Sequence, residues 1–259
     1  MPFAELPGIR LHYELSGSRG IPTLVFSNSL GSNLTMWDPQ MAELSRHFQV
    51  LRYDTRGHGQ SSIPSGPYTV EQLGRDVLAL LDHLRLDHVH FCGLSMGGST
   101  GMWLALNVPQ RLRRLVLCNT AANIGTPEIW NPRMEAVRRG GVKAISSGVL
   151  GRWLSDSFRA KAPDIAARVL NMLESSDTGG YLANCAAIRD FDVRHTVASI
   201  HVPTLVITGT SDVSTTAADG HYLAEQIPGA RYLELDAAHL SNIEQSVLFT
   251  AAVRDFLLG

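Results

Sequence analysis

Short apolar runs alternate with longer amphipathic segments along most of the chain. Runs such as TLVF, LVLC and TLVI are almost continuously apolar, which is typical of parallel strands covered on both faces. The segment IRLHYEL instead alternates apolar and polar residues, so it is predicted as an antiparallel edge strand. The predicted strands are Ile9–Leu15, Thr23–Ser27, Phe48–Tyr53, Val89–Cys92, Leu115–Cys118, Thr204–Thr208 and Arg231–Leu235.

Helical spacing is clearest between Tyr68 and Leu84, where apolar residues recur every three or four positions. Thr69 followed by Gln72 predicts a capping box at the start of this helix. A second helix is expected from about Gly98 to Asn107, and a closing helix from Asn242 to Leu258. Strands that alternate with helices predict an α/β fold with a mostly parallel central sheet flanked by helices.

The alternation stops between residues 121 and 195, which are helix-like and contain Trp130 and Trp153. This segment carries eight Arg and two Lys against eight acidic residues, or +2, whereas the rest of the chain is −4. An insertion that follows a parallel strand leaves from the sheet edge where α/β proteins bind ligands. We therefore expect residues 1–120 and 196–259 to form the core and residues 121–195 to form an inserted helical cap (lid).

Composition excludes several classes of function. With 44% hydrophobic residues the chain can bury a core, and a net charge of −2 offers no basic surface for nucleic acid. The longest strictly apolar stretch, Val77–Leu81, is far too short for a membrane span. Three cysteines without metal-like spacing, and a start without a signal-peptide pattern, predict a cytoplasmic protein. The sequence does not indicate an oligomeric state.

The strongest local motif is Gly93-Leu94-Ser95-Met96-Gly97, a G-x-S-x-G pentapeptide between the strand VHFC and a predicted helix. In this context the serine occupies a strained strand–turn–helix corner, and glycines are needed because strand and helix cross closely. Ser95 is thus the candidate nucleophile.

A serine nucleophile needs a general base that is held by an acid. Asp212 and His239 each follow a late predicted strand and occur in the order Ser, Asp, His. Two other acids are weaker candidates. Asp236 is too near His239 in sequence and is interpreted as a loop-capping residue, and Asp219 is expected in the following helix. His88 and His90 have no third residue at metal-site spacing, so no metal site is predicted.

Acyl transfer also requires two hydrogen-bond donors for the oxyanion. The backbone N–H of Met96, directly after the nucleophile, is one candidate. The other is expected in the loop Ser27–Gly31, and we assign it to Leu30.

GLSMGG, the segment Tyr53–Ser61, GTSD and AAH together resemble the α/β-hydrolase family over essentially the whole chain. Asn28-Ser29 stands where many members have His-Gly, which leaves a main-chain donor in place. In the family the aspartate and arginine equivalent to Asp54 and Arg56 shape a loop beside the pocket, so structural roles are expected for both.

Three further stretches resemble the 3-oxoadipate enol-lactone hydrolases: Phe26–Gly31 leading into Met36–Gln40, Ile124–Arg133, and Ala186–Asp190. The resemblance implies hydrolysis of a small anionic lactone without any cofactor. The substrate carboxylate then needs a cationic partner. Trp130, Arg133 and Arg189 in the cap are the candidate binding residues, with solvated lid arginines as the alternative.

Two other readings of the function stay open. The same three residues would serve a general carboxylesterase or a cofactor-free perhydrolase, and a receptor-like binding protein can retain the fold. Dehalogenases and epoxide hydrolases of this fold are disfavoured, because they carry Asp where this chain has Ser95.

Overall fold

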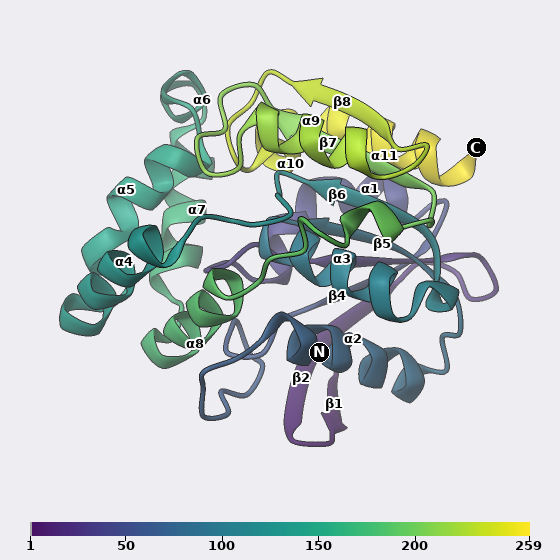
Figure 1. Cartoon of the computed structure of the whole chain (residues 1–259), viewed down its shortest axis with the longest axis horizontal. Helices are drawn as coiled ribbons and strands as arrows, with labels where there is room; N and C mark the ends of the chain where they lie inside the picture. Colours follow the sequence, from purple (N-terminus) through teal and green to yellow (C-terminus); the bar gives the residue numbers. More distant parts are fainter. Residues whose placement is uncertain (1) are drawn as a thin grey trace.

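The computed structural model describes residues 2–259, which form an eight-stranded sheet with helices on both faces (Figure 1). The strand order is β1-β2-β4-β3-β5-β6-β7-β8. The strands are β1 (Phe3–Leu6), β2 (Ile9–Ser16), β3 (Thr23–Ser27), β4 (Gln49–Tyr53), β5 (Val89–Leu94), β6 (Leu112–Cys118), β7 (Thr204–Gly209) and β8 (Arg231–Leu235).

The strands from β3 to β8 run parallel, and β3, β4, β5 and β7 are buried along their whole length. This burial explains the almost continuous apolar sequences of β3 and β7. The predicted fold class is confirmed, because the sheet is mostly parallel and flanked by helices. The carboxyl ends of these strands therefore open on one edge of the sheet, where ligands bind in such folds.

The first hairpin corrects one prediction. β2 is antiparallel as predicted, but it is not the edge, because β1 pairs with it on the outside. Gly8, with φ of +74°, makes the tight connection between the two strands. At four residues, β1 is too short to give a reliable alternating pattern.

Helices cover both faces of the sheet. The helices α1 and α11 pack together on one face, and α2, α3 and α9 lie on the other. The core helices are α1 (Asp38–Leu44), α2 (Val70–Leu84), α3 (Met96–Asn107), α9 (Ala217–Gln226), α10 (Ser241–Glu244) and α11 (Ser246–Leu258), with 3₁₀ turns at Leu34–Trp37, Pro109–Arg111 and Val197–Ser199.

The capping box predicted at α2 is present, with Thr69 and Gln72 each bonding the other's backbone N–H. The predicted closing helix is instead two helices, because Gln245 leaves the helical conformation between α10 and α11. Its side chain donates a hydrogen bond to the Asp236 carbonyl, which fixes the break. Of residues 2–259, no helix has the length and apolarity that a bilayer crossing requires.

Five helices lie between β6 and β7 and gather at one end of the molecule (Figure 1). We call them the cap: α4 (Pro127–Gly140), α5 (Lys143–Trp153), α6 (Asp156–Lys161), α7 (Pro163–Glu174) and α8 (Thr178–Arg189). Where the chain leaves and re-enters the core, the Val193 N–H donates to the Ala122 carbonyl, and Asn123 bridges to Asp192. The cap is thus an excursion whose two ends are joined.

Candidate active site

Ser95 occupies the corner between β5 and α3 with φ of 58° and ψ of −113°. Such a conformation is strained for a residue with a side chain, and strain of this kind concentrates at functional sites. The corner is held by the Ser95 N–H, which donates to the Cys118 carbonyl at 2.9 Å. The end of β6 thereby fixes the backbone that carries the Ser95 hydroxyl.

Crowding explains the two glycines of the motif. A Cβ on Gly93 would lie 2.1 Å from the Gly97 carbonyl oxygen, and one on Gly97 would lie 2.1 Å from the Ser27 carbonyl oxygen. No side chain fits at either position without moving the backbone. The close crossing also brings the loop after β3 against the start of α3.

Asp212 and His239 come from loops after β7 and β8 and form a buried pair. The His239 Nδ1–H donates to Asp212 Oδ2 at 2.7 Å. Asp212 also accepts from the backbone N–H groups of Ser214 and Thr215, the Thr215 hydroxyl and the Asn119 amide. Burial alone would raise the pKa of Asp212, but His239 and these donors bring it below its usual range. The carboxylate is therefore held in its charged form.

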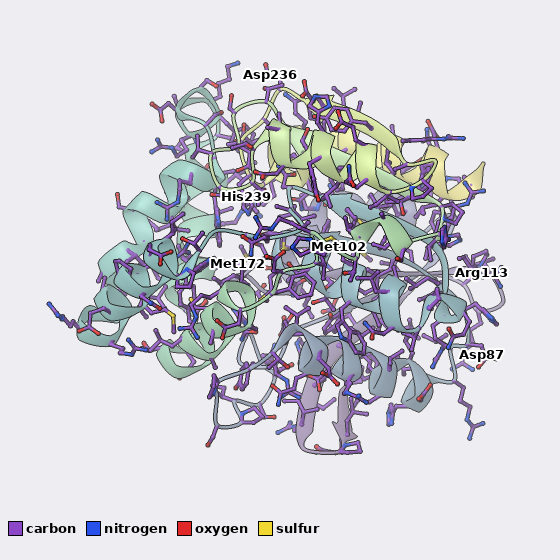
Figure 2. All side chains as sticks on the ribbon, in the orientation of Figure 1. Asp87, Met102, Arg113, Met172, Asp236 and His239 are labelled. Carbon is purple, nitrogen blue, oxygen red and sulfur yellow. The ribbon has the colours of Figure 1, made fainter. Side chains whose placement is uncertain are left out.

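The alternative acids lie elsewhere. Asp219 is in α9, where it completes a capping box with Thr216. Asp236 is exposed and lies at the outer margin of the molecule, whereas His239 lies between the cap and the core (Figure 2). The interpretation of Asp236 as a loop-capping acid is wrong, because within residues 2–259 its carboxylate accepts no hydrogen bond and its main-chain carbonyl is the acceptor for Gln245.

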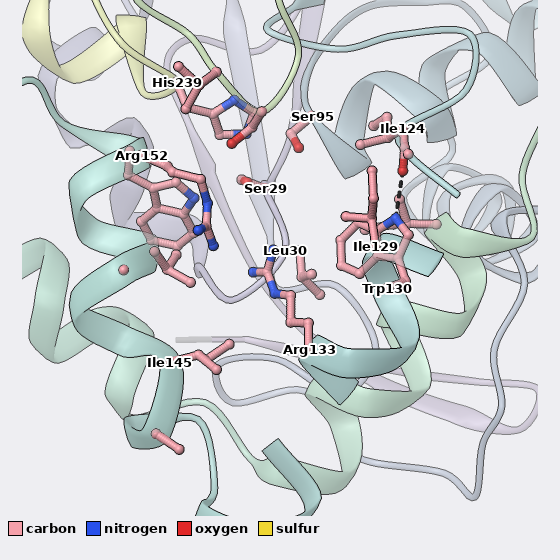
Figure 3. Close-up of a pocket in the computed structure, with 18 residues that line it drawn as sticks. Ser29, Leu30, Ser95, Ile124, Ile129, Trp130, Arg133, Ile145, Arg152 and His239 are labelled. Atoms are coloured by element: carbon pink, nitrogen blue, oxygen red, sulfur yellow. Dashed lines mark hydrogen bonds between the residues drawn. The ribbon is translucent and has the colours of Figure 1, made fainter. Parts of the chain in front are cut away.

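A pocket of about 510 Å³ separates the sheet edge from the cap. Ser95 and His239 face this pocket together (Figure 3). Its lining is Ser29, Leu30, Ser95, Ile124, Gly125, Ile129, Trp130, Arg133, Ala144, Ile145, Gly148, Val149, Arg152, Trp153, Ile188, Val213, Ser214 and His239. The lining is mostly apolar, so the few polar groups on it determine how a ligand is oriented.

Leu30 lines the pocket, and its backbone N–H has no acceptor within residues 2–259. Met96 is the first residue of α3, so its N–H is one of those that lack an acceptor within the helix. Both amides are free to donate to a ligand. They lie where the close crossing brings the β3 loop to the nucleophile corner.

The loop that carries Leu30 is fixed on both sides. The Asn28 side chain donates to the Tyr53 carbonyl and accepts from the Trp37 indole N–H. The Gly31 N–H donates to His58 Nε2 at 2.8 Å. Burial lowers the pKa of His58 to about 4, so the ring is neutral and can accept this bond. Asn28 thus anchors the loop through its side chain.

Asp54 and Arg56 have structural contacts. Asp54 accepts from His12 and from the Leu34 N–H, and Arg56 forms a bidentate pair with Asp76 of α2. Neither residue lines the pocket.

The predicted binding residues separate into two groups. Arg133 lines the pocket and stacks on Trp130, with its guanidinium carbon 5.0 Å from the ring centre. Trp130 also lines the pocket, and its indole N–H donates to the Ile124 carbonyl (Figure 3). Arg189 points away: it forms a bidentate pair with Asp190 and is absent from the lining. The prediction for Arg189 is wrong in placing it at the pocket.

Arg152 is the charged pocket residue that the sequence analysis did not predict. It lies on α5, lines the pocket, and faces the same cavity as Arg133 (Figure 3). The lining residues of α5 fall on one helical face, namely Ala144, Ile145, Gly148, Val149, Arg152 and Trp153. This spacing was a usable signal, because it marks the cap face that turns toward the core.

The end of α5 also contacts the loop that carries His239. The His239 N–H donates to the Arg152 carbonyl at 3.4 Å, and the Leu240 N–H donates to the Trp153 carbonyl at 2.9 Å. Next along the chain, the Glu244 carboxylate accepts from the backbone N–H and hydroxyl of Ser155. The histidine loop and the cap are therefore joined.

Metal-binding geometry is absent from the described part of the chain, in which no three His, Cys, Asp or Glu side chains cluster suitably. His90 is buried, with its ring edge against Phe48, while His88 is exposed.

Comparison with known proteins agrees with this geometry. A family model described as alpha/beta hydrolase fold matches residues 22–246. The chain is 43% identical to 3-oxoadipate enol-lactonase 2 of Acinetobacter baylyi, over 95% of this chain and 92% of that protein. Its sequence is 50% identical to that of an enol-lactonase from Burkholderia xenovorans with a known crystal structure. The two structures superpose with a TM-score of 0.98 over the whole of both chains. An esterase from Thermogutta terrifontis is 29% identical, with a TM-score of 0.93, over 99% of this chain and 98% of that one. The chain therefore belongs to the alpha/beta hydrolase family.

Proposed function

We propose that the protein is a 3-oxoadipate enol-lactonase, a serine hydrolase that opens the enol lactone to 3-oxoadipate. The observation that carries the proposal is a serine and an aspartate-bound histidine facing one pocket that also contains unpaired arginines. The similarity to two enol-lactonases over nearly the whole chain supports it.

In the proposed reaction, Ser95 Oγ attacks the ring carbonyl while His239 Nε2 takes its proton. Asp212 holds Nδ1–H, which fixes the tautomer and stabilises the imidazolium. The negative charge moves to the carbonyl oxygen, and in this proposal the N–H groups of Leu30 and Met96 donate hydrogen bonds to it.

Collapse of this intermediate breaks the bond between the acyl carbon and the ring oxygen. The leaving oxygen takes the proton from His239 and departs as an enol, which leaves His239 neutral again, and tautomerisation to the ketone favours ring opening. His239 then removes a proton from water, which attacks the acyl-Ser95 ester. The second collapse frees the carboxylate and returns the proton to Ser95.

We infer that residues 121–195 act as a cap domain on a core of residues 1–120 and 196–259. The joined ends at Ala122 and Val193 support these boundaries. Trp130 and Arg133 supply the stacking and cationic groups that meet the anionic lactone from this side.

A cytoplasmic location belongs to the same proposal. The three cysteines, Cys92, Cys118 and Cys185, are buried free thiols. Free thiols suit a reducing compartment.

The test is a substrate panel with purified protein: the enol lactone, a nitrophenyl ester, and monochlorodimedone with peroxide. We expect the highest kcat/KM on the lactone, measured as loss of its ultraviolet absorbance. Ser95→Ala should reduce kcat by at least about 10⁴-fold without unfolding the protein. Faster turnover of the ester would support a general esterase, and faster halogenation would support a perhydrolase. Either result would overturn the proposal.

A further inference from the structure

Two guanidinium groups face the pocket without an acidic partner. Arg133 and Arg152 form no ion pair within residues 2–259, and no Asp or Glu lines the pocket. The nearest polar partner of Arg133 is the Tyr181 hydroxyl, and its Nε is buried without an acceptor. The Arg152 side chain has no hydrogen-bond partner in this part of the chain.

The absence of an acidic partner for Arg133 and Arg152 is not due to a lack of acidic residues in the cap. Arg139 pairs with Glu135, Arg159 with Asp156, and Arg189 with Asp190, all on the cap surface. Arg133 and Arg152, which turn inward, have no counter-ion, and among the other cap arginines only Arg168, which is exposed to solvent, also lacks one within residues 2–259. Such sites are costly unless a ligand brings the missing charge, because a partly buried cation loses hydration.

The guanidinium groups of Arg133 and Arg152 also repel each other electrostatically. Burial lowers the pKa of Arg152, and the charge of Arg133 lowers it further. Repulsion between them is relieved when an anion lies between them. A carboxylate has two oxygens and accepts several hydrogen bonds, so it can bridge two guanidinium groups.

We propose that Arg152 is a specificity-determining residue, and that Arg152 and Arg133 hold one substrate carboxylate between them. This inference rests on the proposed function for the identity of the lactone. The class of ligand that it predicts is broader than this one lactone. It includes any small ester or lactone whose acyl part ends in a carboxylate.

The main chain of Arg152 determines the distance between the bound substrate carboxylate and the general base His239. Its carbonyl accepts from the His239 N–H, and the following residue holds Leu240. The Ser155–Glu244 hydrogen bonds fix the same connection one turn further on. The carboxylate-binding group and the general base therefore stand at a constant separation, so the pocket selects the length of the acyl arm as well as its charge.

The experiment compares two aryl esters of nearly equal shape, the mono-4-nitrophenyl ester of succinic acid and 4-nitrophenyl butyrate, alongside the lactone. We expect Arg152→Ala to raise KM for the lactone and to lower the succinate-to-butyrate ratio of kcat/KM by about 10- to 100-fold. Arg152→Lys keeps the charge but loses the planar fork, so it should give a smaller loss. Arg139→Ala, on the exposed face of the cap, is the matched control and should leave the ratio unchanged.

A double-mutant cycle with Arg133→Ala tests whether the two groups share one carboxylate. Shared binding predicts non-additive losses, whereas separate partners predict additive ones. Equal loss on both aryl esters in Arg152→Ala, or additive losses in the cycle, would overturn the inference. Because the ester ratio does not use the lactone, failure of the wild-type protein on the lactone would refute the proposed function and leave this test intact.

Discussion

The two walls of the pocket differ in how their polar groups are satisfied. On the sheet side, Asp212 accepts five hydrogen bonds, and the loop around Leu30 is anchored on both sides. On the cap side, Arg133 and Arg152 face the cavity without an acid. The charged groups of the sheet-side wall are paired without a ligand, and within residues 2–259 the Leu30 and Met96 amides there remain free. The charged groups of the cap-side wall need an anion to neutralise them.

This difference indicates a division of work. A wall whose charged groups are already paired and whose free amides are held in place changes little when substrate arrives, which is the condition for preorganised catalysis. A wall with unpaired charges gains most from the ligand that neutralises them. Changes on the sheet side should therefore reduce turnover of every substrate, whereas changes on the cap side should alter the preference among substrates.

The largest effect is expected from Asp212→Asn. The amide would present a donor to His239 Nδ1 and favour the wrong tautomer, so kcat should fall by about 10⁴-fold on both the lactone and a neutral ester. Asp219→Asn, at the exposed start of α9, is the control. A loss confined to the anionic substrate would contradict this division of work, because it would assign Asp212 a role in substrate binding.

A smaller effect is expected from pH at His58. Its folded pKa is about 4, below the unfolded value near 6.5, so the unfolded state takes up the proton first as pH falls. The contribution of His58 to the free energy of unfolding should be constant above about pH 6.5 and fall by up to about 3 kcal/mol as the pH is lowered to about 4. His58→Gln should flatten this decline in urea unfolding measured at several pH values.

A His90→Gln variant distinguishes an effect of acid on stability from an effect of acid on activity. Burial lowers the pKa of His90 to about 4 as well, but this residue contacts neither Leu30 nor Gly31. Acid should therefore weaken the Leu30 loop through His58 only. A similar change in the acid limb of kcat for His90→Gln and His58→Gln would contradict the anchoring role.

The smallest effect on turnover is expected from Arg133→Ala. Losing a charged hydrogen bond to the substrate should raise KM for the lactone by about 10- to 100-fold and lower the preference for anionic over neutral esters. Arg189→Ala, whose arginine is paired with Asp190, should leave that preference unchanged. Equal losses on both kinds of substrate would remove Arg133 from the binding role.

The sheet and the nucleophile corner could be predicted because local sequence determines them. Buried parallel strands require apolar runs, and the crossing at Gly93 and Gly97 excludes side chains, so both leave a pattern. The Asp212–His239 contact follows from the strand order, because both loops leave the same edge of the sheet. The Leu30 amide needed the loop geometry as well, which Asn28 and His58 fix from distant segments.

The cap was harder to predict because its residues are placed by helix packing. Arg133 and Arg189 look equivalent in the sequence, yet the half-buried Arg189 side chain pairs with its neighbour Asp190 and does not line the pocket. Arg152 gave only the weak signal of one helical face. The break at Gln245 depends on a hydrogen bond to Asp236, and no local propensity records such a contact.

The link between the cap and the histidine loop has a consequence for how this enzyme can diversify. Arg152 and Trp153 hold His239 and Leu240 through carbonyl oxygens, which every amino acid possesses. Evolution or a designer can therefore exchange the side chain at position 152 while the general base keeps its support. New substrate preferences then become accessible by single codon changes, without rebuilding the machinery that makes and breaks the ester bond.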